Sequence, residues 1–135
     1  MTNWFSHQAL DLQTSKPLIY TAMSKHLFYF KQHISKFVLE QWGIPLNPFM
    51  LFDYFFLDTI DRDIVREANN NVVIKADEIW VFGPVSNGVL AEVQIAKQQN
   101  KPVKYFQIQK SRNIVAIEKS EVEMEDEVKD FRSEL

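Results

Sequence analysis

The 135-residue sequence predicts a single α/β domain with a parallel sheet flanked by helices, of the Rossmann-like or flavodoxin-like type. Short apolar, β-rich segments alternate along the chain with longer segments whose apolar residues repeat at helical spacing. The length is that of one ordinary domain, and 46% hydrophobic with 24% charged residues is typical of a packed globular protein. Because such alternation produces βαβ units, we expect parallel strands with ligands bound beyond their carboxyl ends.

The first predicted strand covers residues 17–22 and is followed by Ser24, a good helix N-cap. Residues 1–15 show no clear period, so we expect an N-terminal arm there. A helix should run from residue 25 to about 42, since its apolar residues recur at i, i+3 and i+7. Gly43 should end this helix.

Residues 44–48 predict a short second strand or an extended crossover, because their two prolines limit ladder hydrogen bonds. The next segment, 49–56, contains five aromatic residues, and some of them should be buried. We expect a second helix from after Asp58 to about residue 76, weakened by three consecutive asparagines. Its apolar residues repeat every four positions, at Ile64, Ala68, Val72 and Ala76.

The clearest strand covers residues 78–82 and is followed by a turn. A helix should begin at Gly88 or Val89 and end at Gln99, with Asn100 as a left-handed cap.

The closing part of the domain should contain a strand at residues 104–108, and residues 113–118 can add another. We therefore expect the α/β domain to span residues 16–118. Residues 119–135 should form an acidic C-terminal helix or tail.

Composition excludes several classes of function. The net charge is −3, but residues 118–135 carry eight acidic and three basic side chains, which leaves +2 on the rest. No basic stripe marks the body, so we expect no polymeric nucleic acid as a partner. No apolar run has the roughly 20 residues of a membrane helix, no signal peptide opens the chain, and Cys is absent. We expect a cytoplasmic protein without a membrane partner.

The segment from Ser86 to Glu92 is the strongest candidate for chemistry. Gly88 lets backbone approach a ligand, and the free N–H groups of the following helix favour an anion such as phosphate. Glu92 lies about one turn inside, where the helix dipole favours its ionised form and so preserves a carboxylate nucleophile. Alternatively, Gly88 only turns the chain and Glu92 only supports a surface helix.

Several segments resemble the nucleoside 2-deoxyribosyltransferase-like superfamily, which includes the 2′-deoxynucleoside 5′-monophosphate N-glycosidases. Residues 16–24 resemble its opening strand and loop, and residues 76–83 resemble its central strand. The match continues through the pattern Ser86-x-Gly88-Val89-x-x-Glu92, Ala96 and residues 101–103, so it covers about residues 16–108. Residues 50–56 and 78–83 also resemble an uncharacterised bacterial and phage branch.

The resemblance implies that Glu92 attacks the anomeric carbon and that Tyr20 orients it by a hydrogen bond. It also implies that Ser24 and Ser86 hold a 5′-phosphate, together with the amides near Gly88 and Val89. From the residues alone, Tyr20 can equally be a core residue and Ser24 only a helix cap. Members of the superfamily are commonly homo-oligomers with shared active sites, which implies a homodimer or a larger assembly.

The sequence departs from the superfamily at two positions. Asn69 stands where an aspartate usually helps the base to leave, and an amide cannot donate an acidic proton. The transferases usually carry Asp at the position of Ser86, so serine favours a 5′-phosphate over a 5′-hydroxyl. Base departure would then be slow, absent, or assisted by another acid such as Asp53, Asp61 or Asp63, of which the last two can instead cap or solvate the second helix.

The remaining polar and aromatic residues are less specific. Trp80 and the aromatic segment 49–56 can stack on a nucleobase or belong to the core. His7, His26 and His33 lack metal-ligand spacing, so we expect no metal and no other cofactor.

The leading hypothesis is an enzyme that cleaves or exchanges the N-glycosidic bond of a small 2′-deoxynucleotide or nucleoside. A nucleotide-binding module without chemistry and a structural partner-binding domain are the alternatives.

Overall fold

The computed structural model describes residues 5–52, 58–110 and 112–135. Within these residues five strands form one sheet in the order β2-β1-β3-β4-β5. The first four run parallel and β5 pairs with β4 in the antiparallel direction. The strands are β1 (Leu18–Met23), β2 (Ile44–Leu46), β3 (Glu78–Phe82), β4 (Val103–Gln109) and β5 (Asn113–Ile117). The predicted α/β class is confirmed.

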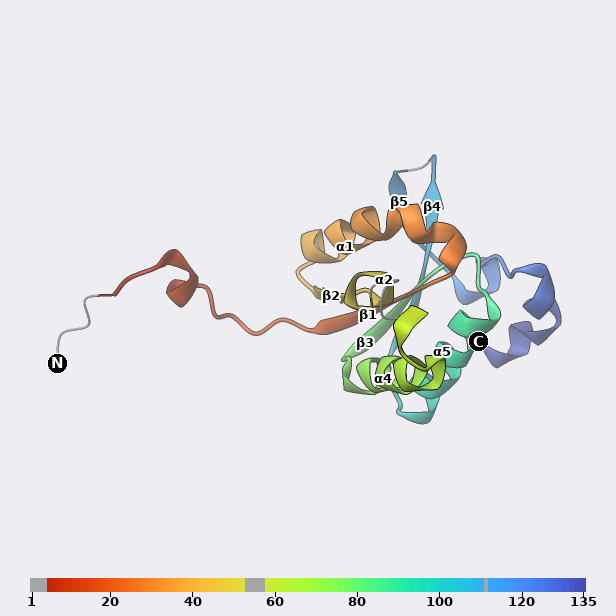
Figure 1. Ribbon diagram of the computed structural model, residues 1–135. Coiled ribbons are helices and arrows are strands. Elements are labelled where there is room, and N and C mark those ends of the chain that lie inside the picture. Colours follow the sequence, from red (N-terminus) through yellow and green to blue (C-terminus); the bar gives the residue numbers. More distant parts are fainter. Residues whose placement is uncertain (1–4, 53–57, 111) are drawn as a thin grey trace.

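Helices cover both faces of the sheet (Figure 1). Helix α1 (Lys31–Glu40) lies on one face, and helices α4 (Arg62–Lys75) and α5 (Asn87–Gln98) lie on the other. The side chains of β1 alternate between the two faces: Tyr20 belongs to the core cluster under α4 and α5, whereas Ile19 belongs to the cluster under α1. The sheet therefore has a separate apolar core on each side.

The helix expected from residue 25 to 42 differs from the prediction at both ends. It begins as a 3₁₀ helix, η2 (Lys25–Phe30), and becomes α-helical only in α1. In a 3₁₀ turn residues three apart lie above one another, which lets Leu27 and Phe30 pack against the same core cluster.

The left-handed residue at the end of α1 is Trp42, with φ of 67°, and not Gly43. A Cβ on Gly43 would lie 2.7 Å from Cγ1 of Ile19, so this glycine permits a close approach to β1.

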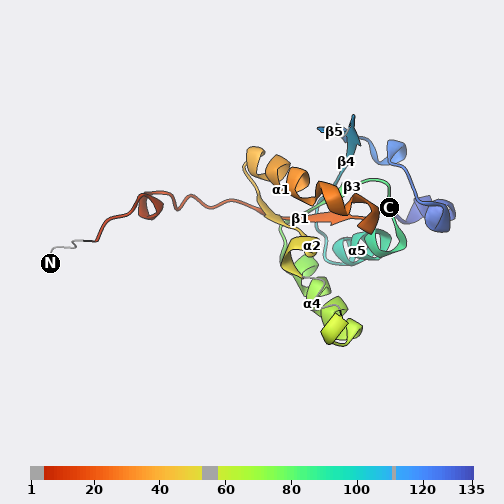
Figure 2. The ribbon, with the colours of Figure 1, turned by 45° about the horizontal axis from the view of Figure 1, so that its top comes forward.

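Helix α4 is shorter and less buried than its apolar pattern predicts. It begins after Asp61, whose side chain accepts a hydrogen bond from the amide of Asp63. Ile64 is 63% exposed and Ala68 is also exposed, because this half of α4 extends away from the sheet (Figure 2). Only the C-terminal part of the helix, around Val73, enters the core.

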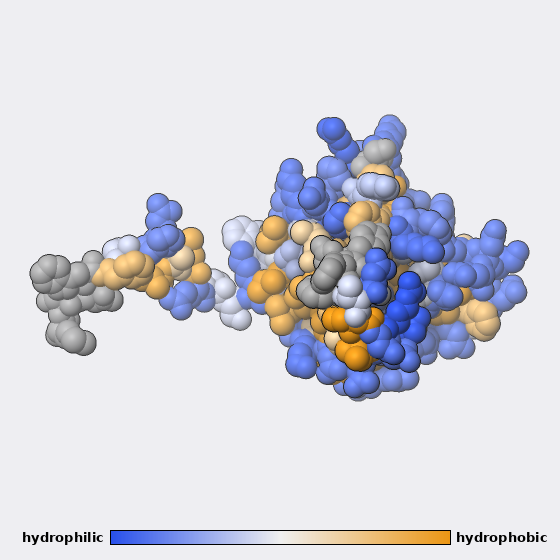
Figure 3. All heavy atoms as spheres, viewed as in Figure 1, coloured by the Kyte–Doolittle hydropathy of each residue, from blue (hydrophilic) through white to orange (hydrophobic). Residues whose placement is uncertain are grey.

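Exposed apolar side chains also occur on the short helix α2 (Pro48–Leu51), where Met50 and Leu51 are about half exposed. Figure 3 shows apolar surface among charged side chains on the face of the molecule that carries α2 and the start of α4. The aromatic segment predicted at residues 49–56 lies partly outside the described residues, because 53–57 are not described.

The acidic C-terminal segment folds back on α5 as two 3₁₀ helices, η3 (Lys119–Glu121) and η4 (Asp126–Glu134). Val122, Val128 and Leu135 are buried in the core cluster under α5. The N-terminal residues 5–17 are exposed and extend away from the domain, with a single 3₁₀ turn, η1 (Gln8–Asp11). In the described part of the chain, no helix has the length and apolar character needed to cross a membrane.

Candidate active site

The candidate site lies where β1 and β3, adjacent strands of the sheet, end. Met23 and Phe82 are register partners at these carboxyl ends. The chain leaves β1 toward α1 on one face and leaves β3 toward α5 on the other. From β1 the chain adds β2 on one side of the sheet, and from β3 it adds β4 on the other side. The boundary between β1 and β3 is therefore a topological switch point, which is where α/β sheets bind ligands.

Three polar side chains from three different elements meet on the α4 and α5 face near this edge. Tyr20 of β1 is fully buried, whereas Asn69 of α4 and Glu92 of α5 are half-buried. The Tyr20 hydroxyl donates a hydrogen bond to Oε2 of Glu92. The Asn69 amide nitrogen lies 2.8 Å from the same oxygen and 2.9 Å from the Tyr20 hydroxyl. Among the described residues, none forms a hydrogen bond with Oε1 of Glu92.

The environment of Glu92 changes its acidity. Desolvation by burial raises the pKa of Glu92 from 4.5 to about 7, although the hydrogen bonds from Tyr20 and Asn69 act in the opposite direction. The helix dipole is expected from the sequence to favour the ionised form, but burial leaves this carboxyl group only about half ionised near neutral pH. Burial and the neighbouring Glu92 charge also raise the pKa of Tyr20 well above 10, so the phenol stays a neutral donor.

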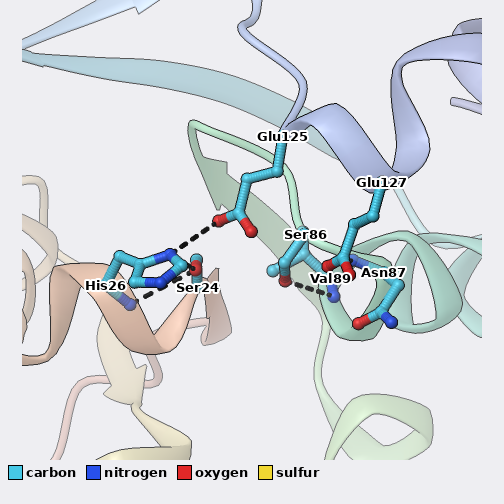
Figure 4. Close-up of polar contacts among 7 residues, drawn as sticks. All are labelled: Ser24, His26, Ser86, Asn87, Val89, Glu125 and Glu127. Atoms are coloured by element: carbon cyan, nitrogen blue, oxygen red, sulfur yellow. Dashed lines mark hydrogen bonds and ion pairs between the residues drawn. The ribbon is translucent and has the colours of Figure 1, made fainter.

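The two serines lie at the ends of the adjacent strands and both cap helices. Oγ of Ser24 accepts a hydrogen bond from the amide of His26 at 3.2 Å, at the start of η2. Oγ of Ser86 accepts one from the amide of Val89 at 3.3 Å, at the start of α5. Figure 4 shows the two serines near each other at the starts of η2 and α5, and Ser24 is buried whereas Ser86 is partly exposed. The capping role that the sequence allowed for Ser24 is present in the structure.

Gly88 lies within the first turn of α5 and does not turn the chain. A Cβ there would meet nothing closer than Oγ of Ser86, at 3.9 Å, so the neighbouring residues do not require glycine. Glycine in a helix costs roughly 0.5–1 kcal/mol relative to alanine. A ligand that approaches the backbone at Gly88 would explain why glycine stands there. The buried side chain of Val89 anchors the same turn of α5 in the core.

Two glutamates that the sequence analysis did not single out lie beside these serines (Figure 4). Oε2 of Glu125 is 3.2 Å from Nδ1 of His26, and Oε1 of Glu127 accepts a hydrogen bond from the amide of Asn87 at 3.4 Å. The alternation of apolar Val122 and Met124 with acidic residues was the available signal that this segment docks. Acidic composition alone did not indicate where.

Trp80 does not join this cluster. Its ring is 7% exposed and packs against Phe37 and Phe106 in the core cluster under α1, on the opposite face from Tyr20. The indole nitrogen donates to Glu78 at 3.0 Å. Because side chains alternate along a strand, Trp80 cannot stack on a base that is bound beside Glu92.

The aspartates that were candidates to protonate the base lie far from Glu92 or outside the described residues. Asp61 caps α4 and Asp63 pairs with Arg66 at 2.8 Å, and both aspartates are exposed. Asp61 precedes Asn69 by eight residues, which is about 12 Å along a helix. Asp53 lies outside the described residues. No group of three His, Cys, Asp or Glu residues suited to a metal ion occurs in the described ranges.

A hollow of about 190 Å³ adjoins the loop after β3 on the side of η2. It is lined by Leu27 and Phe30 of η2, by Gly83 and Pro84, and by residues of β4 and β5. Glu92 is not among its lining residues, so this hollow is separate from the cluster of Tyr20, Asn69 and Glu92.

A family model described as a domain of unknown function, DUF7768, matches residues 20–106. The matched region includes Tyr20, Asn69 and Glu92, whereas Glu125 and Glu127 lie beyond it. No curated protein matches the chain.

Proposed function

The chain belongs to the DUF7768 family, and we propose that it cleaves or exchanges the N-glycosidic bond of a small 2′-deoxynucleoside or 2′-deoxynucleotide. The observation that carries this proposal is the convergence of Tyr20, Asn69 and Glu92 at the switch point between β1 and β3. A carboxylate with one oxygen held by two donors and the other left for a ligand is suited to attack a sugar carbon.

In the proposed reaction, ionised Glu92 attacks C1′ of the deoxyribose through Oε1. The C1′–N bond breaks and its electron pair goes to the base nitrogen, which takes a proton from water. The oxocarbenium-like transition state is stabilised by the adjacent negative charge. Water or a second base then attacks C1′ of the glycosyl ester and releases Glu92 as a carboxylate.

Tyr20 and Asn69 act on Glu92 and not on the base in this proposal. Their hydrogen bonds to Oε2 hold the carboxyl group in one orientation and favour its charged form. The resemblance of residues 16–108 to the nucleoside 2-deoxyribosyltransferase-like superfamily supports the same roles for Glu92 and Tyr20. Ser24, Ser86 and the first turn of α5 would contact the 5′ end of the sugar.

Release of free base tests the proposal. The purified protein is incubated with the four common 2′-deoxynucleosides and their 5′-monophosphates, and free base is measured by chromatography. We expect release by the wild type, loss with Glu92→Ala, and no change with Glu67→Gln, which removes an exposed carboxylate of α4. A glycosyl adduct on Glu92, detected by mass spectrometry, would identify the nucleophile. No release from the whole panel, or equal release by Glu92→Ala, would rule the enzyme out.

A nucleotide- or nucleoside-binding module without chemistry is the second candidate. Asn69 favours it, because the amide beside Glu92 cannot supply a proton to a departing base. A binder would be stabilised by intact ligand in a thermal-shift experiment while no base accumulates. No stabilisation by any member of the panel would exclude both candidates.

We further propose that the protein acts as a homodimer or larger homo-oligomer in the cytoplasm. The exposed apolar side chains of Met50, Leu51, Ile60 and Ile64 on α2 and around the start of α4 support self-association. Light scattering coupled to size-exclusion chromatography tests this. A monomer at micromolar concentration would contradict it, and a surface that instead captures another protein would favour a structural partner-binding domain.

A further inference from the structure

The C-terminal segment brings two carboxylates beside the starts of η2 and α5, where Ser24 and Ser86 cap these helices. Figure 4 shows Glu125 extending toward His26 and Glu127 toward the first turn of α5. Glu127 accepts a hydrogen bond from the amide of Asn87, at the positive end of the helix dipole, where a ligand anion would bind. In the described residues, His26 is the only basic side chain that forms an ion-pair contact with either glutamate.

Backbone contacts hold these carboxylates in place. Val85 donates to the carbonyl of Glu123 and accepts from the amide of Glu125, both at 2.8 Å. The buried side chains of Val122 and Val128 anchor the segment on either side. The two glutamates are therefore fixed to the loop that precedes α5 and do not belong to a loose tail.

A ligand bound at Glu92 with its sugar ring along α5 would point its 5′ end toward these carboxylates. Asn87 precedes Glu92 by five residues, which is about 7.5 Å along the helix axis. A deoxyribose with C1′ at the Glu92 carboxyl group and its ring along α5 would direct its 5′ carbon toward Asn87. A 5′-hydroxyl there can donate a hydrogen bond to a carboxylate, whereas a phosphate would meet two like charges.

We propose that Glu125 and Glu127 make the site selective for 2′-deoxynucleosides with a free 5′-hydroxyl and reject the corresponding 5′-monophosphates. This inference rests on the proposed function for the identity of the ligand. It reverses the preference for phosphate that Ser86 suggested, since the side chain of Glu127 already accepts the amide of Asn87 at the anion position of α5.

Calorimetric titration tests the inference. Each 2′-deoxynucleoside and its 5′-monophosphate is titrated into the wild type, Glu125→Gln/Glu127→Gln and the control Asp126→Asn/Asp130→Asn. The control removes two exposed charges from the same segment. The wild type should bind the nucleoside at least about tenfold more tightly than the monophosphate. The glutamine variant should tighten monophosphate binding by a similar factor without weakening nucleoside binding, and the control should change neither.

Three results would overturn the inference: equal affinity of the wild type for both ligands, an unchanged affinity ratio in the glutamine variant, or no binding by either ligand class. If the double variant unfolds, Glu127→Gln alone repeats the comparison, because this side chain is exposed. Base release is measured separately. Release from both ligands with equal efficiency would overturn the selectivity but keep the proposed enzyme. Selective binding without release would keep the selectivity but overturn the proposed enzyme.

Discussion

The phenol of Tyr20 donates a hydrogen bond to the carboxyl group of Glu92, a residue 72 positions away in the sequence. Tyr20 is fully buried on β1 and its pKa is raised, so the donor remains neutral at every pH in which the protein would be assayed. Glu92 receives a second hydrogen bond from Asn69, yet its desolvation still raises its pKa to about 7. At neutral pH, Glu92 is therefore protonated in about half of the molecules and ionised in the other half.

Replacing Glu92 by glutamine should change how stability depends on pH. The pKa of Glu92 is about 7 in the folded protein and 4.5 is its ordinary value, so the folded state binds more protons between these pH values. The free energy of unfolding should therefore fall as pH rises from about 4.5 to about 7. At about 1.4 kcal/mol for each pKa unit, this amounts to about 3 kcal/mol.

Urea denaturation at pH 5 and pH 8 measures the effect. Glu92→Gln should be close to the wild type at pH 5 and more stable by up to about 3 kcal/mol at pH 8. Subtracting the two proteins at each pH cancels the other titrating groups. A constant difference between the two pH values would show that the pKa of Glu92 is not raised.

Tyr20→Phe should move the pH dependence of base release to higher pH. If Glu92 is the nucleophile, kcat/KM should rise with pH through a midpoint near 7, because only the ionised form attacks. The Tyr20 hydrogen bond lowers the pKa of Glu92, so its removal should raise the midpoint. A purely structural role for Tyr20 would reduce the yield of folded protein or its stability by about 1 kcal/mol without moving the midpoint.

Asn69→Asp tests whether the amide limits the reaction. Two carboxyl groups at the 2.8 Å separation seen between Asn69 and Glu92 cannot both ionise readily, so they would share a proton. That proton is available to a departing base, and we expect base release to increase by about 10²-fold or more at pH 6. Asn69→Ala serves as the control, since it removes the amide without supplying an acid. An equal or lower rate in the aspartate variant would mean that base protonation does not depend on this position.

Ser86 can be tested by two substitutions that separate capping from ligand contact. Ser86→Ala removes the acceptor for the amide of Val89 and should cost about 1 kcal/mol in the free energy of unfolding. Ser86→Asp keeps an N-cap and should retain wild-type stability, but its added charge should weaken any phosphate ligand further. Thermal denaturation combined with ligand titration distinguishes the two effects. Similar stability of both variants would show that the cap contributes little.

Much of the secondary structure follows from local pattern. The strand predicted at residues 78–82 is β3 with the same bounds, and Asn100 has the left-handed conformation, with φ of 55°, that its position before Pro102 predicts. The prediction is wrong where tertiary packing, and not the local apolar pattern, decides whether a residue is buried. The apolar repeat of α4 continues through Ile64 and Ala68, but no described part of the domain covers this half of the helix.

The candidate site was only partly predictable. Tyr20 and Glu92 were identified as a pair through a resemblance and lie in contact, while Trp80 is on the other face of the sheet. Side chains alternate between the two faces of a sheet along a strand, so the sequence predicts that Trp80 and Ile79 lie on opposite faces. It does not predict which of the two faces carries the site. Glu125 and Glu127 were treated as part of an acidic tail, since nothing local in an acidic segment specifies the surface on which it docks.

The amino-acid sequence by itself determined the alternation of strands and helices, and with it the end of the sheet at which polar residues gather. These properties depend on residue periodicity and on caps within a few positions of each other. Tertiary structure alone decided that Asn69 joins Tyr20 and Glu92, that Glu92 loses enough water to raise its pKa to about 7, and that Glu127 covers the first turn of α5. Desolvation and charge proximity arise from elements distant in the chain, so only the folded arrangement sets them.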